Sequence, residues 1–266
     1  MKYMTFNSSC AFAGVANMLE SFGIDKEDRE LAIGMKLPYL FDETYRTGAS
    51  LQSAEHFNLY LNQLGITMQE EQLPKHEMIK TLKHSTRPMM IGINLEFGKH
   101  AIIFKNYQNG HFCFTNNKRF DSEKPAEYRF TEAELSDRLD ETTVVGWLED
   151  APIKDVDFTP FFEKSLFNLQ KYRVELLAFC DIEQSVENLN AARDPLFRPI
   201  ALDGLVIMEL VENEKMVAMQ QEIQTKLLAM LRKQEPVIPK QELPMDLIAN
   251  VLDEYVVLIK EQLGAI

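Results

Sequence analysis

The stretch that decides the fold lies near the N-terminus and reads Asn7-Ser8-Ser9-Cys10-Ala11-Phe12-Ala13-Gly14-Val15-Ala16-Asn17-Met18-Leu19. Its apolar side chains recur at the spacing of one helix face, and the pattern continues to residue 22, before a glycine that can end a helix. We therefore predict a helix over residues 10–22 with Cys10 at its start. A thiol at a helix N-terminus faces the positive end of the helix dipole and unpaired N–H groups, which favour the thiolate. The sequence predicts a lowered thiol pKa and a nucleophilic role for Cys10.

Composition excludes several classes of partner. The chain has 266 residues, 45% of them hydrophobic, and a formal net charge of −13. Such a chain can bury one large core or two ordinary ones. Phosphate binding needs clustered Lys and Arg, and no such run occurs, so we expect no nucleic-acid partner. The negative charge also disfavours binding to an anionic membrane.

The cysteine pattern indicates a reducing compartment. Cys10, Cys113 and Cys180 cannot all pair and form no CxxC spacing, so neither a disulfide framework nor a metal site is expected. Neither a secretory signal nor an apolar run of membrane-spanning length is present. We expect a cytoplasmic protein without membrane insertion. No Gly-rich phosphate loop occurs, so no cofactor is expected.

The first half of the chain begins with helices. Beyond the first helix, Asp25 is predicted to cap a helix that ends near residue 35. A helical stripe follows over residues 50–64, and Pro74 suits the first position of a helix that runs to about residue 83. The loop over residues 38–41 is apolar. These helices come before any predicted strand.

The pattern changes after residue 88. Short apolar or aromatic runs predict strands at 89–95, 100–107, 111–115 and 143–148. Asn109-Gly110 predicts a hairpin turn, and Thr131 with Glu134 predicts a capping box for a short helix. Helices followed by antiparallel strands indicate an α+β domain over residues 1–150.

Beyond residue 150 helical patterns dominate. Thr159-Pro160 predicts the start of a helix that continues to about residue 179. Further helices are predicted at 181–192, at 202–231 with a break near Glu212, and at 245–263. We therefore expect an all-α helical domain over residues 151–266.

Three residues form the candidate catalytic set. Cys10 would be the nucleophile, His100 at the start of one strand the general base, and Asn116 at the end of the next strand the group that orients the imidazole. One hairpin separates His100 from Asn116, so adjacent strands can bring them together. The Cys10 backbone N–H and the Asn7 side-chain amide are the candidate oxyanion donors.

Each candidate has a simpler alternative. Cys10 can be a small buried apolar residue, as Cys113 and Cys180 are expected to be. His111 is an alternative base, because it lies on a strand close to Cys113. The order of Cys, His and Asn along the chain favours the catalytic interpretation.

Several short motifs resemble the papain-like cysteine peptidases that process bacteriocin leader peptides. The motifs are Ser9-Cys10-Ala11-Phe12-Ala13, Met18-Leu19, Phe22-Gly23, Lys99-His100-Ala101-Ile102-Ile103 and Phe114-Thr115-Asn116. The resemblance covers about residues 1–150 and implies helices packed on an antiparallel sheet. It also implies the roles of nucleophile for Cys10, base for His100 and orienting group for Asn116. Those peptidases usually carry Asp where this chain has Asn116, and an oxyanion Gln where it has Met4.

A second resemblance is to the acyltransferase of butirosin biosynthesis. It rests on Glu30-Leu31-Ala32-Ile33-Gly34-Met35, the apolar loop that follows and the helical second half. That family transfers an acyl group from a carrier-protein thioester to an amine. The resemblance implies that the helical domain shapes the acceptor pocket or docks the donor.

Together these observations predict a thiol-dependent hydrolase or acyltransferase that works through an acyl-thioenzyme. Its substrate would be a peptide, an amide or an acyl-carrier-type thioester. The alternatives are a catalytically inactive papain-like binding or regulatory protein, and a helical scaffold with a coincidental cysteine.

Overall fold

The computed structural model describes residues 1–96, 98–233 and 237–264. The chain packs as two compact units, Met1–Met35 with Gln52–Val156, and Lys36–Leu51 with Asp157–Ile266. The units therefore interleave once, because residues 36–51 pack with the helical second half. The division into domains 1–150 and 151–266 stays a prediction.

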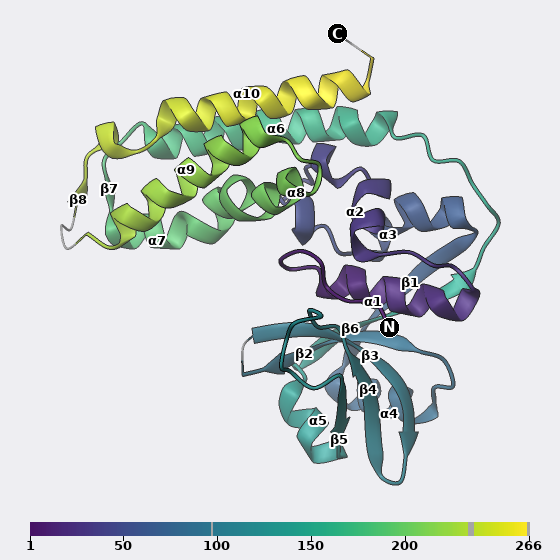
Figure 1. Cartoon of the computed structure of the whole chain (residues 1–266). Helices are drawn as coiled ribbons and strands as arrows, with labels where there is room; N and C mark the ends of the chain where they lie inside the picture. The colour runs from purple at the N-terminus through teal and green to yellow at the C-terminus, as the bar shows by residue number, and fades with distance from the viewer. Residues whose placement is uncertain (97, 234–236, 265–266) are drawn as a thin grey trace. The chain divides into compact units, whose positions relative to one another are not determined.

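The first unit contains an antiparallel sheet, which has six strands in the part of the chain that the structure describes (Figure 1). The strands are β1 (Ile66–Pro74), β2 (Met89–Leu95), β3 (Gly98–Gln108), β4 (His111–Asn116), β5 (Glu127–Phe130) and β6 (Thr142–Asp150). Their order across the sheet is β1-β6-β2-β3-β4-β5. The four predicted strands are present as β2, β3, β4 and β6.

Two strands were not predicted from sequence. β1 lies at one edge of the sheet, and its central residues, Gln69 to Gln72, are exposed apart from the pairing with β6. Polar and charged side chains are typical of edge strands, where they discourage pairing with other chains. β5 forms the opposite edge and is only four residues long. β1 lacks apolar alternation at its centre, and β5 alternates polar and aromatic residues but is too short to be recognised as a strand.

The helices of this unit begin close to the predicted positions. They are α1 (Cys10–Leu19), α2 (Asp28–Gly34), α3 (Ala54–Leu61), α4 (Lys75–His84) and α5 (Glu132–Arg138). The predicted cap at Asp25 is wrong: Glu27 caps α2 in a capping box with Glu30, and the Asp25 carboxylate instead forms an ion pair with Lys2. Pro74 ends β1 and precedes α4, whose first residue is Lys75.

Helices pack on the sheet on both sides. α4 and α5 join the strands in one apolar cluster that includes Met89, Ile91 and Phe104. Met90 points to the opposite face, because side chains alternate along a strand, and there it meets α1. A Cβ atom at Gly14 would lie 2.7 Å from the Met90 sulfur and 2.8 Å from Asn117 Nδ2. Glycine therefore lets α1 approach the sheet closely, with the half-buried Cys10 as the first residue of the helix.

The second unit is mostly helical. Its helices are α6 (Thr159–Cys180), α7 (Val186–Ala192), α8 (Gly204–Leu210), α9 (Glu214–Leu231) and α10 (Met245–Gln262). Two-residue strands β7 (Gln184–Ser185) and β8 (Val237–Ile238) pair, and π-helical turns span Arg193–Phe197 and Pro199–Asp203. The predicted break near Glu212 is confirmed, with a left-handed φ of 58° at that residue. Residues 234–236 and 265–266 of the predicted helical domain lie outside the described residues.

The apolar loop of residues 36–51 belongs to this helical core. The Phe41 ring packs against Tyr172 and Tyr255, and its main chain bonds to the side chains of Ser165 and Asn168 on α6. None of the helices in the described ranges has both the length and the apolar character needed to cross a membrane.

Candidate active site

The N-terminus of α1 presents Cys10 from a strained turn. Ser8 has a left-handed φ of 63°, which is uncommon for a residue with a Cβ atom. The Ser9 hydroxyl donates to the Phe6 carbonyl at 2.8 Å, and the Ser9 side chain does not cap the helix. The Gln52 side chain donates to the Ser8 carbonyl at 3.0 Å. These contacts hold the turn that places the thiol at the first position of the helix.

The Cys10 sulfur lies against the start of β3. It accepts backbone N–H hydrogen bonds, of which the one from Ala101 has the largest effect on its pKa. Ala101 directly follows His100, so this contact places the thiol beside the residue predicted to be its base. The juxtaposition joins the start of α1 to a strand 90 residues further along the chain.

Burial raises the pKa of the Cys10 thiol, and the backbone N–H groups only partly oppose this effect. The predicted lowering of the pKa is therefore wrong in direction. In its half-buried position the thiolate loses much of its hydration. The N–H groups at the helix start and at Ala101 stabilise it less than that lost hydration would have done. The resting side chain is a neutral thiol at neutral pH.

His100 and Asn116 form a buried hydrogen-bonded pair. His100 Nε2 lies 2.8 Å from Asn116 Oδ1. The Asn116 Nδ2 group donates to the Pro125 carbonyl at 2.6 Å, which fixes the orientation of the amide. Its oxygen must therefore face the imidazole, and Nε2 must carry the hydrogen. The imidazole is therefore oriented by Asn116 on one side, and it also forms a hydrogen bond with the backbone of Asn117.

The environment of His100 favours the neutral imidazole. Burial lowers its pKa, and the positive charge of Lys124 lowers it further, whereas the hydrogen bonds to the Asn116 side chain and to the Asn117 backbone raise it. The net effect is a pKa below the ordinary value for histidine. At neutral pH the protein thus holds a neutral thiol next to a neutral base.

A pocket of about 260 Å³ contains both groups. Its lining consists of Met4, Ser8, Cys10, Lys99, His100, Asn117, Lys118, Arg119, Ser122 and Lys124. Asn116 supports His100 from behind this lining. A reactant in the pocket would have access to the thiol and the imidazole together.

Asn7, the predicted side-chain oxyanion donor, lies outside the lining of the pocket. Asn7 is exposed and is not one of the lining residues, and its Oδ1 accepts from Arg119 Nη2 at 2.7 Å. Met4, which occupies the position of the oxyanion Gln in the resembled peptidases, does line the pocket. Its thioether cannot donate a hydrogen bond. The oxyanion role of Asn7 stays a prediction.

Sequence reasoning missed the loop that follows β4. Asn117 is fully buried, donates to the Ala101 carbonyl at 3.0 Å and forms part of the pocket wall. Lys118, Arg119 and Lys124 line the same pocket. The run Asn117-Lys118-Arg119 directly after Asn116 was the available signal, but only the folded loop shows that it faces Cys10.

The simpler alternatives take other positions. His111 is exposed at the β3–β4 hairpin, where its ring bonds to the Asn109 carbonyl, and it is not a lining residue of the pocket. Cys180 is fully buried, and burial raises its pKa to about 12. Cys113 is half-buried on β4. Of these candidates, Cys10 and His100 are the pair found in the lining of one pocket.

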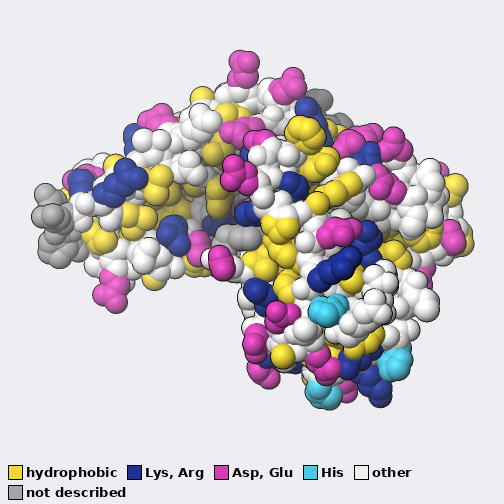
Figure 2. Space-filling model, turned by 60° about the horizontal axis from the view of Figure 1, so that its bottom comes forward, with side chains coloured by type: hydrophobic (Ala, Val, Ile, Leu, Met, Phe, Trp, Pro, Cys, Tyr) yellow, Lys and Arg dark blue, Asp and Glu magenta, His cyan; other side chains and the backbone are white. Residues whose placement is uncertain are grey.

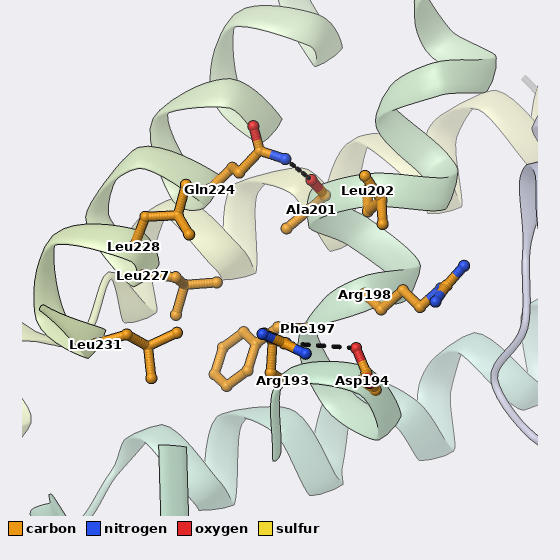
Figure 3. A pocket seen from close by; sticks show the side chains of 10 residues that line it. All are labelled: Arg193, Asp194, Phe197, Arg198, Ala201, Leu202, Gln224, Leu227, Leu228 and Leu231. Carbon is orange, nitrogen blue, oxygen red and sulfur yellow. Dashed lines mark hydrogen bonds and ion pairs between the residues drawn. The ribbon is translucent and has the colours of Figure 1, made fainter. Parts of the chain in front are cut away.

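A second pocket, of about 380 Å³, lies within the helical unit (Figure 3). It lies between the π-helical turns and α9, and is lined by Arg193, Asp194, Phe197, Arg198, Ala201, Leu202, Gln224, Leu227, Leu228 and Leu231. None of these described lining residues is a Cys, Ser, Thr or His. The larger pocket therefore offers no nucleophile and no imidazole base.

Comparison with known proteins gives similarity in fold. No protein-family profile and no curated sequence matches the chain. Among solved structures, one similar chain is the peptidase domain of Streptococcus ComA, a bifunctional ABC transporter involved in quorum sensing. It is 14% identical with a TM-score of 0.41, and the match covers 57% of this chain and 96% of that one.

Another similar structure is a double-glycine-motif protease from an AMS/PCAT transporter in complex with its leader peptide. Its identity is 11% and its TM-score 0.40, over 56% of this chain and 89% of that one. At these scores the activity has to be argued from the residues of the pocket themselves.

Proposed function

We propose that the chain is a thiol-dependent hydrolase or acyltransferase that forms an acyl-thioenzyme on Cys10. The observation that carries this proposal is that Cys10 and His100 line one pocket, while Asn116 Oδ1 lies 2.8 Å from His100 Nε2 and orients the imidazole. A thiol, an oriented base and space for a reactant are the requirements of nucleophilic acyl transfer.

The first half-reaction transfers the acyl group to sulfur. His100 takes the Cys10 proton as the sulfur attacks the carbonyl carbon, which forms a C–S bond and a tetrahedral oxyanion. The oxyanion collapses, the bond to the leaving nitrogen or sulfur breaks, and His100 returns the proton to that atom. The products are the acyl-thioenzyme and a free amine or thiol.

The second half-reaction releases the acyl group. His100 removes a proton from water or from an acceptor amine, whose oxygen or nitrogen attacks the thioester carbon. The C–S bond breaks, and the proton returns to the sulfur. Water gives hydrolysis, whereas an amine gives acyl transfer.

The protonation states support general-base catalysis. The Cys10 pKa is raised and the His100 pKa is lowered, so the resting pair is uncharged. The proton then moves during attack, and no thiolate–imidazolium pair has to exist beforehand. The hydrogen bond from Nε2 to Asn116 stabilises the imidazolium as it forms.

The proposal includes the Cys10 N–H and Asn7 as oxyanion donors. It also includes a catalytic domain over residues 1–150, a cytoplasmic location, and a peptide, amide or acyl-carrier-type thioester as substrate. The runner-up is an inactive papain-like binding or regulatory protein. One observation favours it: Met4 lines the pocket with a side chain that cannot stabilise an oxyanion.

The test is single-turnover acylation with thioesters of N-acetylcysteamine, followed by intact-mass spectrometry and by release of free thiol. We expect a covalent adduct on Cys10, and no adduct in Cys10→Ala. Cys113→Ala is the matched control, because it removes a half-buried thiol outside the pocket. Adding an amine separates an acyltransferase, whose turnover rises, from a hydrolase. Equal thiol release by Cys10→Ala and the unmodified protein would exclude the proposed mechanism.

A further inference from the structure

The pocket around Cys10 is lined by cations. Lys99, Lys118, Arg119 and Lys124 line it, and none of its described lining residues is acidic. This bias runs against the composition of the chain, which has 41 acidic and 28 basic residues. Acidic and basic side chains mix over the visible face in Figure 2. A lining with one sign of charge is therefore a local property of this pocket.

Two of these cations are held by neutral oxygen atoms. Lys118 Nζ donates to the Ser122 carbonyl at 2.5 Å, and Arg119 Nη2 donates to Asn7 Oδ1 at 2.7 Å. Among the described residues, neither Lys118 nor Arg119 forms an ion pair with a carboxylate. Their positive charges are thus not cancelled locally.

The other two cations differ in their surroundings. Lys99 forms an exposed ion pair with Asp140 at 2.6 Å, so part of its charge is neutralised. Lys124 lies close enough to His100 for its charge to lower the imidazole pKa. The field of Lys124 therefore reaches the reacting groups.

The backbone fixes the loop that carries these side chains. The Met4 N–H donates to the Lys118 carbonyl at 2.9 Å, and the Asn116 N–H donates to the Ala126 carbonyl at 2.9 Å. Asn117, buried beneath the loop, binds the Ala101 carbonyl. The main chain that carries Lys118 is consequently held beside the pocket before any ligand arrives.

We propose that this pocket selects acyl groups that carry a negative charge close to the reacting carbonyl, of which a terminal carboxylate is the simplest form. This inference takes the reaction from the proposed function. It takes the preference for a negative charge from the residues that line the pocket. Because Cys10 and the cations share about 260 Å³, the charge must lie on the group that enters with the carbonyl. Cations in a confined cleft raise the local concentration of an anionic reactant.

An anionic acyl group would also assist the base. Its charge would offset the repulsion between Lys124 and a forming His100 imidazolium, since the two cations would then share an anion. Substrates with an anionic acyl group would therefore react faster than neutral substrates of the same size.

The first test compares two alkylating agents of nearly equal size, anionic iodoacetate and neutral iodoacetamide. Both react by displacement of iodide by the thiolate, so the ratio of their rates cancels the thiolate fraction and reports the local field. Peptide mass spectrometry reads Cys10 and, as an internal reference, Cys113. We expect the ratio at Cys10 to exceed that at Cys113 about tenfold at low ionic strength, and to fall as salt is added.

Charge removal provides the matched comparison. The double variant Lys118→Gln/Lys124→Gln should lose most of the iodoacetate preference. Lys80→Gln, an exposed lysine on α4 that does not line the pocket, should keep it. Equal ratios at Cys10 and Cys113 in the unmodified protein, or a preference that survives the double variant, would overturn the inference.

The second test uses turnover of adipoyl and adipamoyl thioesters of N-acetylcysteamine, which differ only in a terminal carboxylate or amide. We expect kcat/KM to favour adipoyl about tenfold, and the double variant to remove this preference. Equal turnover of both would leave the proposed function standing and overturn the charge selection. If neither thioester reacts, the proposed function fails, and the labelling ratio alone decides whether the pocket selects anions.

Discussion

The pocket in the helical unit and the pocket at Cys10 differ in what surrounds their charged groups. In the helical unit, Arg193 lies 3.5 Å from Asp194, and Arg198 Nε lies 2.9 Å from the buried Asp203 carboxylate. Figure 3 shows Arg193, Asp194 and Arg198 on one side and the leucines of α9 on the other. At Cys10, by contrast, Lys118 and Arg119 contact neutral oxygen atoms.

The two pockets thus differ in how far their charges are neutralised within the protein. Opposite charges that are paired within the protein largely cancel each other's field, so they leave little field for a ligand. Uncompensated charges beside a nucleophile retain their field for a reactant. Volume would have suggested the reverse, since the pocket without a nucleophile is the larger one, at about 380 Å³ against about 260 Å³.

The largest effect is expected from His100→Gln. Loss of the base should lower thioester turnover by about 10²–10⁴-fold, the usual contribution of general acid–base catalysis. His111→Gln is the matched control, because His111 is exposed on the hairpin outside the pocket. Steady-state kinetics and thermal unfolding of both variants are the measurements. Equal activity in His100→Gln and His111→Gln would show that the imidazole in the Cys10 pocket is not the base.

A substitution in the pocket of the helical unit should change the stability of the protein and not its activity. Leu227 is 6% exposed, so Leu227→Ala should lower the free energy of unfolding by about 2–4 kcal/mol, the range for a buried leucine. Urea denaturation measures this loss. Acylation of Cys10 should stay unchanged under native conditions, and a parallel loss of acylation would show that this pocket takes part in the chemistry.

The substitution Asn116→Ala should disturb the orientation of the His100 imidazole. Without Oδ1 the imidazole loses the acceptor that selects the Nε2–H tautomer, and kcat should fall about 10–100-fold, as for other residues that orient a reactive group. Asn116→Asp restores an acceptor and should recover part of the loss. Proton or nitrogen NMR of the His100 ring can follow the tautomer. A fall in kcat with an unchanged tautomer would contradict the positioning role.

The pH dependence of Cys10 labelling should reveal the buried thiol. Because burial raises the pKa of Cys10, the iodoacetamide rate should have its midpoint above the free-cysteine value of about 8.5. Peptide mass spectrometry across a pH series is the measurement. A midpoint well below that value would restore the prediction made from the helix N-terminus.

The smallest effect is expected at acid pH. Because burial lowers the pKa of His100, turnover should persist below about pH 6.5 and fall only as the pH drops through the lowered value. Stability should also fall at acid pH. Between the lowered His100 pKa of the folded state and its ordinary value in the unfolded state, the unfolded chain binds more protons, so the folded protein loses stability as the pH falls. His100→Gln should remove this dependence, as measured by urea denaturation at several pH values.

Local signals in the sequence were accurate where local physics decides. Asn109 and Gly110 both adopt left-handed φ, at 51° and 79°, as the predicted hairpin turn requires. The Thr131–Glu134 capping box is present at the start of α5. The cap of α2 was misplaced by two residues, because Asp25 binds Lys2, a contact from a distant part of the chain.

Non-local effects were not predictable from the sequence. The charged edge strand β1 depends on pairing with β6, which lies about 75 residues later. The protonation state of Cys10 depends on burial against β3 as well as on its place at a helix start. The loop cations face the thiol only because Met4 and Asn117 anchor that loop.

The sequence by itself determined which groups are available and in what order: a thiol at a helix start, an imidazole and an amide one hairpin apart, and a helical second half. Helix periodicity, turn residues and caps are local, so they can be read from neighbours along the chain. Only the tertiary structure decided that the thiol and the imidazole share a pocket, that both are neutral, and that cations surround them. Burial and electrostatic fields depend on residues distant in sequence, and folding alone brings those residues together.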